Sequence, residues 1–162
     1  MMNRMKLAVA CAVLLAALSL SGCSAASETQ KQMYGSNSAI AGSADSYTFG
    51  DRTGETKDNE SELSFSKFYG TDSIWTIDAD SEAALKVEYD QEIDGGKLKL
   101  VLVTPGQEVV TIAEGSGQGA SELLLAAGTS TIKLVGNQGK GSVKLRLEAE
   151  DKDVKWTAVG EQ

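Results

Sequence analysis

The sequence predicts an all-β domain, an antiparallel β-sandwich of about seven or eight strands, over residues 44–150. Short segments alternate apolar and polar residues, which is the pattern of strands with one face buried and the other in water. The turns between them rely on glycine, since the chain has 17 glycines and a single proline. No stretch carries the apolar spacing of an amphipathic helix of three turns. An antiparallel barrel is the alternative way to close such a sheet.

The candidate strands follow one another at short intervals along the chain. Leu98, Leu100 and Leu102 fall on one face of the clearest central segment, and Asp94-Gly95-Gly96 before it is a hairpin signal. The polar segment 52–60 is expected to be a loop. The candidate strand segments are 46–49, 63–68, 73–77, 85–89, 97–103, 109–112, 122–125, 130–135 and 143–149.

The N-terminus has the organisation of a secretion signal. Arg4 and Lys6 give a positively charged start, and residues 7–18 form an uncharged apolar stretch. This stretch is shorter than the roughly 20 apolar residues that a transmembrane helix needs. The tetrapeptide Leu20-Ser21-Gly22-Cys23 follows and looks like the lipobox of bacterial lipoproteins. We therefore expect removal of the signal peptide 1–22 and transfer of a diacylglycerol to the Cys23 thiol.

Cysteine usage leads to the same expectation. Cys11 would leave with the signal, so Cys23 becomes the only cysteine of the mature chain and no intramolecular disulfide can form. Two or three acyl chains, such as palmitate, hold a protein far more firmly than one. The expected location is the cell membrane, with the lipid-anchored protein facing away from the cytoplasm. In a cell with two membranes, either one fits.

Two segments flank the expected sandwich. Residues 24–43 are rich in Ser, Ala, Gly, Asn and Gln and have no sustained apolar period. Such a stretch buries too little apolar surface to offset its chain entropy, so 23–43 is expected to be the lipidated Cys23 and a disordered, flexible tether. The tail 151–162 contains Trp156 and is expected either to add an edge strand or to fold back over an edge.

Two motifs extend the fold prediction. They run from Lys86 to Ile112 (KVEYDQEIDGGKLKLVLVTPGQEVVTI) and from Gly128 to Glu148 (GTSTIKLVGNQGKGSVKLRLE). Together they resemble a group of small Firmicutes-type surface lipoproteins, whose jelly-roll sandwich is similar to bacterial pre-peptidase and carbohydrate-module-like domains. Ser130 replaces the aromatic residue usual in that pattern. The resemblance covers the later two-thirds of the domain, implies a sandwich and brings no catalytic residue with it.

Composition excludes several function classes. The net charge is −8, and loss of Arg4 and Lys6 with the signal takes it to −10. Nucleic-acid binding is not expected, because it depends on Lys and Arg that neutralise phosphates. Histidine is absent, which removes the usual general base near neutral pH and the commonest zinc ligand.

Two acidic runs resemble the start of a calcium-binding loop. In both, the twelfth position lacks the glutamate that supplies a bidentate ligand, because it holds Tyr89 in one case and Val101 in the other. No cofactor is expected, and Ca²⁺ held by several loops is a secondary hypothesis beside a solvated acidic face. The candidate ligands are Asp78, Asp80 and Glu82 in the first run, and Asp90, Glu92 and Asp94 in the second.

Tyr69 and Trp75 are the candidate ligand-binding residues, because an exposed aromatic ring can stack on a sugar. A large aromatic residue in a small β domain is more often in the core, and this is the expectation for Trp75. The sequence favours a non-catalytic binding or accessory module for an unknown envelope protein or glycan. A carbohydrate-binding module on the cell surface is the alternative, and an enzyme of unrecognised type is the third hypothesis.

Overall fold

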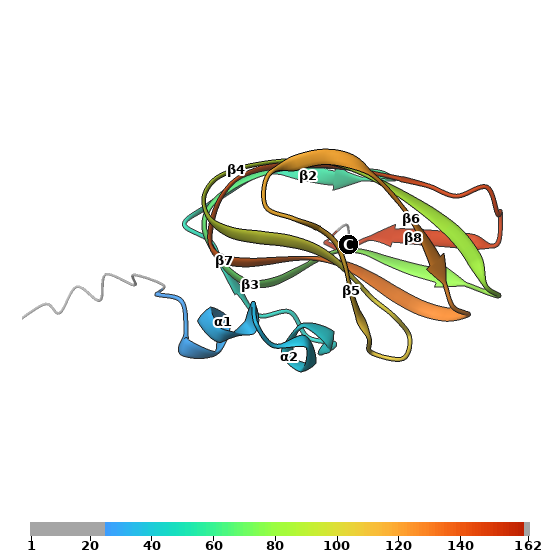
Figure 1. Ribbon diagram of the computed structural model, residues 1–162, viewed down its shortest axis with the longest axis horizontal. Helices are drawn as coiled ribbons and strands as arrows, with labels where there is room; N and C mark the ends of the chain where they lie inside the picture. Colours follow the sequence, from blue (N-terminus) through green and yellow to red (C-terminus); the bar gives the residue numbers. More distant parts are fainter. Residues whose placement is uncertain (1–24, 161–162) are drawn as a thin grey trace, which may run out of the picture.

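The computed structural model describes residues 25–160, and within them it consists mainly of antiparallel strands (Figure 1). The predicted all-β sandwich is confirmed. No helix of this part of the chain has the length and apolar character needed to cross a membrane. In chain order the elements are α1 (Glu28–Met33), α2 (Asn37–Ala41), β1 (Tyr47–Thr48), β2 (Asp51–Lys57), β3 (Glu60–Ala79), β4 (Ala83–Val103), β5 (Val109–Glu114), β6 (Gly117–Leu125), β7 (Gly128–Glu148) and β8 (Val154–Ala158).

Three long strands belong to both layers of the sandwich. β3, β4 and β7 span 20, 21 and 21 residues, and each bends near its middle. The first layer contains β2, β6 and the halves 60–66 of β3, 83–93 of β4 and 141–148 of β7. The second layer contains β5, β8 and the halves 70–79, 97–103 and 128–136, with β1 beside β3 at the bend.

The bend explains why the predicted hairpin at Asp94-Gly95-Gly96 is wrong. The chain does not reverse there, because β4 stays paired with β7 on both sides of two register shifts, between Ile93 and Gly95 and between Gly95 and Lys97. Gly96 has a φ of +67°, and a Cβ on it would lie 2.1 Å from the carbonyl oxygen of Gln138. Glycine is therefore needed for the bend and not for a turn.

A buried aromatic ring fills the inside of the bend. Phe68 of β3 is 0% exposed, and its ring stacks on that of Phe49 with a centroid distance of 4.4 Å. The opposite wall is the backbone of β7 at Gly136, where an added Cβ would lie 2.3 Å from Cδ1 of Phe68. The two strands can therefore approach each other here only with glycine at position 136.

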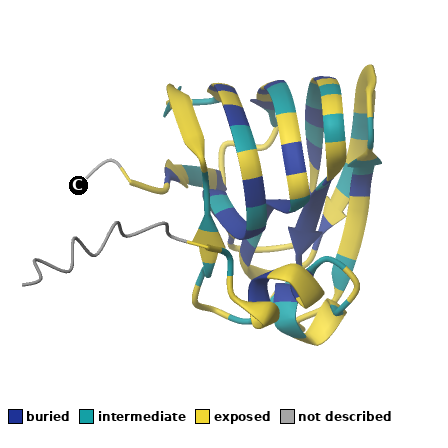
Figure 2. Cartoon of the chain, turned by 90° about the vertical axis from the view of Figure 1, so that its left-hand side faces the viewer, coloured by how far each residue is buried: buried dark blue, intermediate teal, exposed yellow. Residues whose placement is uncertain are grey.

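The main core lies between the two layers. Buried and exposed residues alternate along the strands around the bend, as Figure 2 shows, so one set of side chains from each layer faces inward. The largest inward side chains are almost fully shielded from water. They include Leu63, Trp75, Ile77, Leu85, Leu98, Leu100, Leu125 and Ile132.

The segment 52–60, which was expected to be a loop, contains most of β2. Its residues are exposed at nearly every position, so the sequence shows no apolar alternation. β2 is an edge strand held by backbone pairing with 60–66 of β3. In the second layer, β8 pairs with 75–79 of the same strand β3 and forms another edge, with Trp156 half-buried.

The segment expected to be a disordered tether is ordered from Ser27 onward. Ser27 caps α1 in a reciprocal capping box with Gln30. Met33 and Ile40 are buried against an apolar strip on the outer face of the second layer. Two apolar side chains are enough to hold this polar segment, because the strip would otherwise face water. The strip consists of Val101, Val103 and Val135.

A buried lysine fixes the end of the same segment. The side chain of Lys133 on β7 is 3% exposed, and its Nζ donates to the carbonyl oxygen of Gly42 at 2.8 Å. Nζ also lies 3.2 Å from Oδ1 of Asp45. The hydroxyl of Ser73 donates to the same oxygen, and the backbone N–H of Ser73 donates to Oδ2 of Asp45. A buried charge with these partners is satisfied. The ordered domain therefore starts upstream of the expected boundary at residue 44.

Gly136→Ala is expected to lower the free energy of unfolding by roughly 2–3 kcal/mol, because the new Cβ overlaps Phe68 and the core must shift. Chemical denaturation measures the change. Gly117→Ala is the matched control, since an added Cβ there has no neighbour within 4 Å. Equal stabilities of the two variants would contradict the close approach of β3 and β7 at the bend.

Ile40→Ala is expected to lower the free energy of unfolding by about 2–4 kcal/mol, because Ile40 is 0% exposed and its loss leaves a cavity over the second layer. Gln32→Ala, an exposed position in α1, serves as the control and should change stability little. An unchanged denaturation midpoint for Ile40→Ala would show that the segment is not packed on the sheet.

Candidate ligand-binding groove

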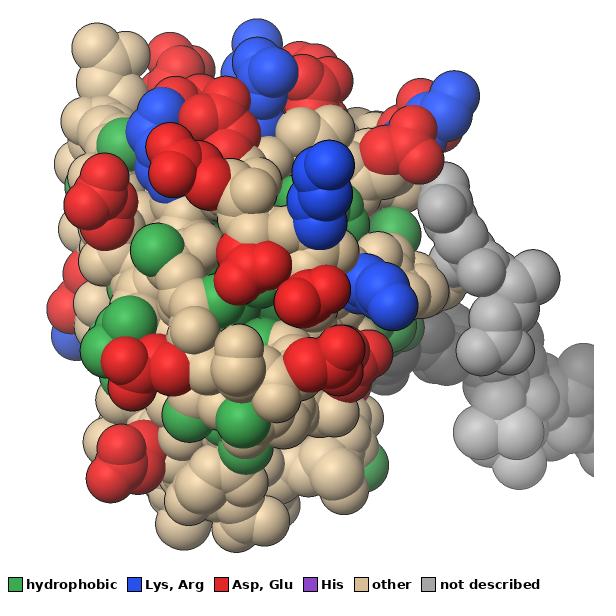
Figure 3. Space-filling model, turned by 90° about the vertical axis from the view of Figure 1, so that its right-hand side faces the viewer, with side chains coloured by type: hydrophobic (Ala, Val, Ile, Leu, Met, Phe, Trp, Pro, Cys, Tyr) green, Lys and Arg blue, Asp and Glu red, His purple; other side chains and the backbone are tan. Residues whose placement is uncertain are grey.

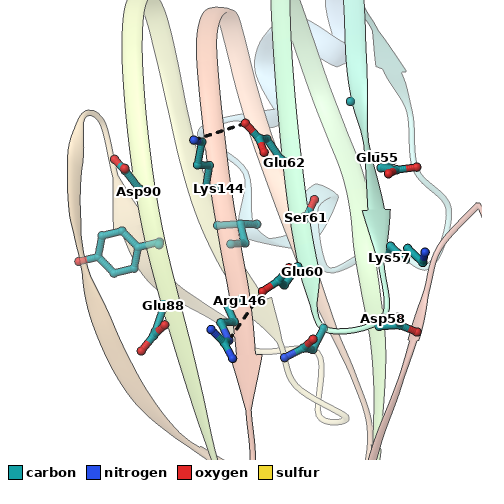
Figure 4. Close-up of a pocket in the computed structure, with 14 residues that line it drawn as sticks. Glu55, Lys57, Asp58, Glu60, Ser61, Glu62, Glu88, Asp90, Lys144 and Arg146 are labelled. Atoms are coloured by element: carbon teal, nitrogen blue, oxygen red, sulfur yellow. Dashed lines mark ion pairs between the residues drawn. The ribbon is translucent and has the colours of Figure 1, made fainter.

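An open groove crosses the outer face of the first layer, over strands β2, β3, β7 and β4 (Figure 4). Its volume is about 830 Å³. This face is opposite the one covered by α1 and α2 (Figure 1). The residues that line it are Gly54, Glu55, Lys57, Asp58, Asn59, Glu60, Ser61, Glu62, Glu88, Tyr89, Asp90, Lys144, Leu145 and Arg146.

Strand alternation places charged side chains in the groove. In β7, Val143 and Leu145 are buried in the core, so Lys144 and Arg146 between and beyond them point outward. The same period operates in β3 with Glu60 and Glu62, and in β4 with Glu88 and Asp90. The alternation that places apolar residues in the core therefore also places these charged residues on the outer face of the layer.

Strand register assembles these charges into rows across the sheet. In one row Lys57 lies opposite Glu60, Glu60 opposite Arg146, and Arg146 opposite Glu88. The neighbouring row contains Glu55, Glu62, Lys144 and Asp90 in the same order. A basic strand, β7, thus lies between two acidic ones.

The ion pairs within these rows are solvent-exposed. Lys144 Nζ is 3.4 Å from Oε1 of Glu62, and Arg146 Nε is 3.9 Å from Oε1 of Glu60. All four side chains are at least half exposed, so each pair adds little to stability. These groups are therefore free to exchange an intramolecular partner for a ligand at low cost.

Lys86 lies beside the groove and forms an ion pair with Glu88. A hydrogen bond from the Lys86 ammonium, together with its charge, lowers the pKa of the Glu88 carboxyl. The reciprocal hydrogen bonds to Glu88 and Glu148 raise the pKa of Lys86. Glu88 is therefore held in its ionised form, which accepts hydrogen bonds and does not donate a proton.

The groove is polar and acidic. Its lining includes six carboxylates against three cations, and Leu145 and Tyr89 are its only large apolar side chains. Acidic side chains also predominate over basic ones at the end of the sandwich that is remote from α1 (Figure 3). Such a lining suits a ligand that is bound by charge-assisted hydrogen bonds.

The two predicted aromatic candidates do not belong to this groove. Trp75 is 0% exposed in the core, and its Nε1 donates to the carbonyl oxygen of Asp58 at 2.9 Å, beneath the groove. The expected core position of Trp75 is confirmed, and the alternative, stacking of Trp75 on a sugar ring, is wrong because the ring has no free face. Tyr69 is half-buried in β3, where it pairs with Thr48 of β1 at the bend.

The two acidic runs are spread along extended backbone. Asp78 accepts a hydrogen bond from Thr129 at 2.6 Å, while Asp80 and Glu82 are exposed around the turn between β3 and β4. Asp90 lines the groove, and Glu92 and Asp94 are exposed further along β4. Within residues 25–160, no three acidic or cysteine side chains come together in a way that could hold a metal ion.

The four lipobox residues, Leu20 to Cys23, lie outside the described residues. Asp90 is the one groove residue that the sequence singled out, as a candidate calcium ligand, and the other groove residues were not among the sequence candidates. They could have been found by comparing the polar positions of strands that lie side by side. Glu60 and Glu62 of β3, for example, lie opposite Arg146 and Lys144 of β7. That reading needs the strand order, which the sequence did not supply.

No family model and no curated protein sequence matches the chain. Two similar solved structures are carbohydrate-binding modules of family 35. One is from an environmental isolate (14% identity, 74% of this chain and 93% of that chain, TM-score 0.38), and the other is from Paenibacillus barcinonensis (14%, 68% and 96%, TM-score 0.34).

A third similar structure is an exo-beta-1,3-galactanase from Phanerochaete chrysosporium. It has 13% identity over 65% of this chain, with a TM-score of 0.38, and this chain spans only 30% of its length. Likeness at these TM-scores carries no argument about function.

Lys86→Met is expected to raise the pKa of Glu88 toward its ordinary value, because the hydrogen bond and the positive charge are removed together. Carboxyl carbon shifts followed by NMR during a pH titration measure it. In the parent protein the ion pair of Lys86 with Glu88 stabilises the fold at pH values above the ordinary pKa of a glutamate. This stabilisation is lost as the pH falls through the lowered pKa of Glu88. Lys57→Met is the control, because Lys57 lines the groove and is not the ion-pair partner of Glu88, so the pKa of Glu88 should stay unchanged. Equal effects of the two substitutions would contradict the pairing of Lys86 with Glu88.

Proposed function

We propose that the chain is a lipid-anchored protein of the extracytoplasmic membrane surface, whose sandwich binds a glycan of the cell envelope without cleaving it. The observation that carries the proposal is the charged groove across β2, β3, β7 and β4. It is wide, open to solvent and lined by side chains that form hydrogen bonds in several directions.

The groove chemistry favours a glycan over a protein partner. Protein interfaces are enriched at their centre in aromatic residues, methionine and arginine and depleted in lysine and glutamate. Binding energy there comes from a few large side chains in dry pockets. Apart from Arg146 and Tyr89, the lining of this groove consists mainly of the depleted kinds, with Glu60, Glu62 and Lys144 exposed. Sugar hydroxyls match it, because each can donate to a carboxylate or accept from an ammonium or guanidinium group.

The protonation of the groove favours binding over catalysis. Hydrolysis of a glycosidic bond requires one carboxylic acid with a raised pKa that can protonate the leaving group. Glu88 is shifted the other way by Lys86. An open, water-filled face is also a poor place to stabilise a charged transition state.

The proposed anchor rests on the N-terminal sequence. A positively charged start, an apolar stretch too short to cross a bilayer and the tetrapeptide Leu20-Ser21-Gly22-Cys23 follow in the order of a lipoprotein signal. A protein held in this way meets the polymers that lie next to the membrane at high local concentration. The anchor therefore supports an envelope glycan as the ligand.

Arg146→Ala is expected to weaken binding to envelope glycan about tenfold, or roughly 1.4 kcal/mol, because it removes charge-assisted hydrogen bonds at the centre of the groove. The probe is wall glycan isolated from the native host, and the soluble chain from position 23 with Cys23→Ser is co-sedimented with it over a range of concentrations. Lys155→Ala is the matched control, since Lys155 is an exposed cation on β8 outside the groove.

Loss of binding in Lys155→Ala and not in Arg146→Ala would show that the ligand binds outside the groove. A parent chain that does not co-sediment with the glycan at all would overturn the glycan proposal. Release of reducing sugar ends during the same incubation would overturn the non-catalytic part of it.

A further inference from the structure

We propose that the domain stands on the bilayer with the corner formed by α1 and β1 against the lipid headgroups, so that the groove faces away from the membrane. This orientation rests on the lipid anchor at Cys23 proposed above. It goes beyond that anchor because it specifies which side of the sandwich faces the membrane.

The link between the anchor and the ordered domain is very short. Ser27 caps α1 four residues after Cys23, and four residues of fully extended chain span at most about 14 Å. The two stacked sheets of a sandwich are about 10 Å apart, and α1, about 10 Å across, packs on the outside of the second layer, so the groove on the outside of the first layer lies roughly 20 Å away. The acyl chains therefore cannot reach the groove face from the point where α1 begins.

α1 is firmly attached to the side opposite the groove. Gln30 is 9% exposed; its amide nitrogen donates to Oγ of Ser46 at 3.3 Å, and its amide oxygen accepts from Oγ1 of Thr48 at 2.9 Å. Met33, one turn on, is buried on the second layer. Figures 1 and 2 show both helices on this side of the sandwich. Rotation of the domain on its link is therefore limited to the few bonds before Ser27.

The side chains at this corner suit the headgroup region. Three of the four tyrosines lie there, and Tyr47 is 50% exposed. Tyr34 ends α1 and lies beneath the ammonium of Lys99, 4.7 Å from its ring centre, while Lys31 is exposed on the helix itself. Tyrosine is enriched at membrane interfaces, and lysine near the surface is attracted by anionic lipids. The third tyrosine is Tyr69, on β3 beside β1.

The charge of the groove is consistent with the same orientation. Six carboxylates against three cations would be repelled by an anionic bilayer at short range. Turning this face outward removes the repulsion and presents the groove to polymers beyond the headgroups. The ligand then approaches from the side of the cell wall or the exterior and not from the lipid.

The test uses the acylated full-length product in vesicles of phosphatidylethanolamine and phosphatidylglycerol. Once the signal is removed and Cys23 is acylated, an introduced cysteine is the only free thiol. Thr29→Cys places it on the exposed side of α1, and Ser64→Cys places it on the outer face of β3, next to the groove. Each is labelled with a small fluorophore, and quenching by nitroxide lipids labelled at the headgroup is measured.

Quenching several-fold stronger at position 29 than at position 64 is expected. Equal quenching, or stronger quenching at position 64, would overturn the orientation even when the protein floats with the vesicles. Flotation separates this outcome from failure of the anchor: if the chain from position 23 with Cys23→Ser floats as well as the acylated chain, the lipid anchor is wrong and the orientation is overturned with it.

Discussion

The close approach of β3 and β7 at the bend is the constraint on which the rest of the structure depends. Phe68 fills the inside of the bend and Gly136 leaves room for its ring, so a strand can pass from one layer to the other without interruption. The core then forms from the inner faces of the same three strands in both layers. Interruption of β3, β4 or β7 at this point would separate the layers and remove the core.

The bend also produces two outer faces with different roles. On the second layer, the apolar strip at Val101, Val103 and Val135 is covered by the N-terminal helices through Met33 and Ile40. On the first layer the corresponding outward positions are charged and remain open. Because the N-terminal helices cover the outer face of the second layer, the outer face of the first layer is the one that remains accessible. The buried Lys133, bonded to Gly42 and Asp45, holds this arrangement in place.

The sequence predicted the all-β class because apolar alternation in segments such as 85–89, 97–103 and 143–149 is a local signal. It did not predict that pairs of these segments are single strands, since a bend at Gly95-Gly96 reads locally as a turn. β2 was missed because an edge strand exposed on both sides shows no alternation. The order of N-terminal residues 27–45 and the charge rows of the groove depend on contacts between distant strands, which no local pattern reveals.

The central claim is that the charged outer face of the first layer is the ligand surface. The most direct measurement is amide hydrogen exchange of residues 23–162, with Cys23→Ser, in the presence and absence of soluble fragments of envelope glycan. Protection that concentrates in 54–62, 88–90 and 144–146 is the predicted result, because these segments line the groove. Protection confined to α1, α2 and β5, with the groove segments unchanged, would contradict the claim.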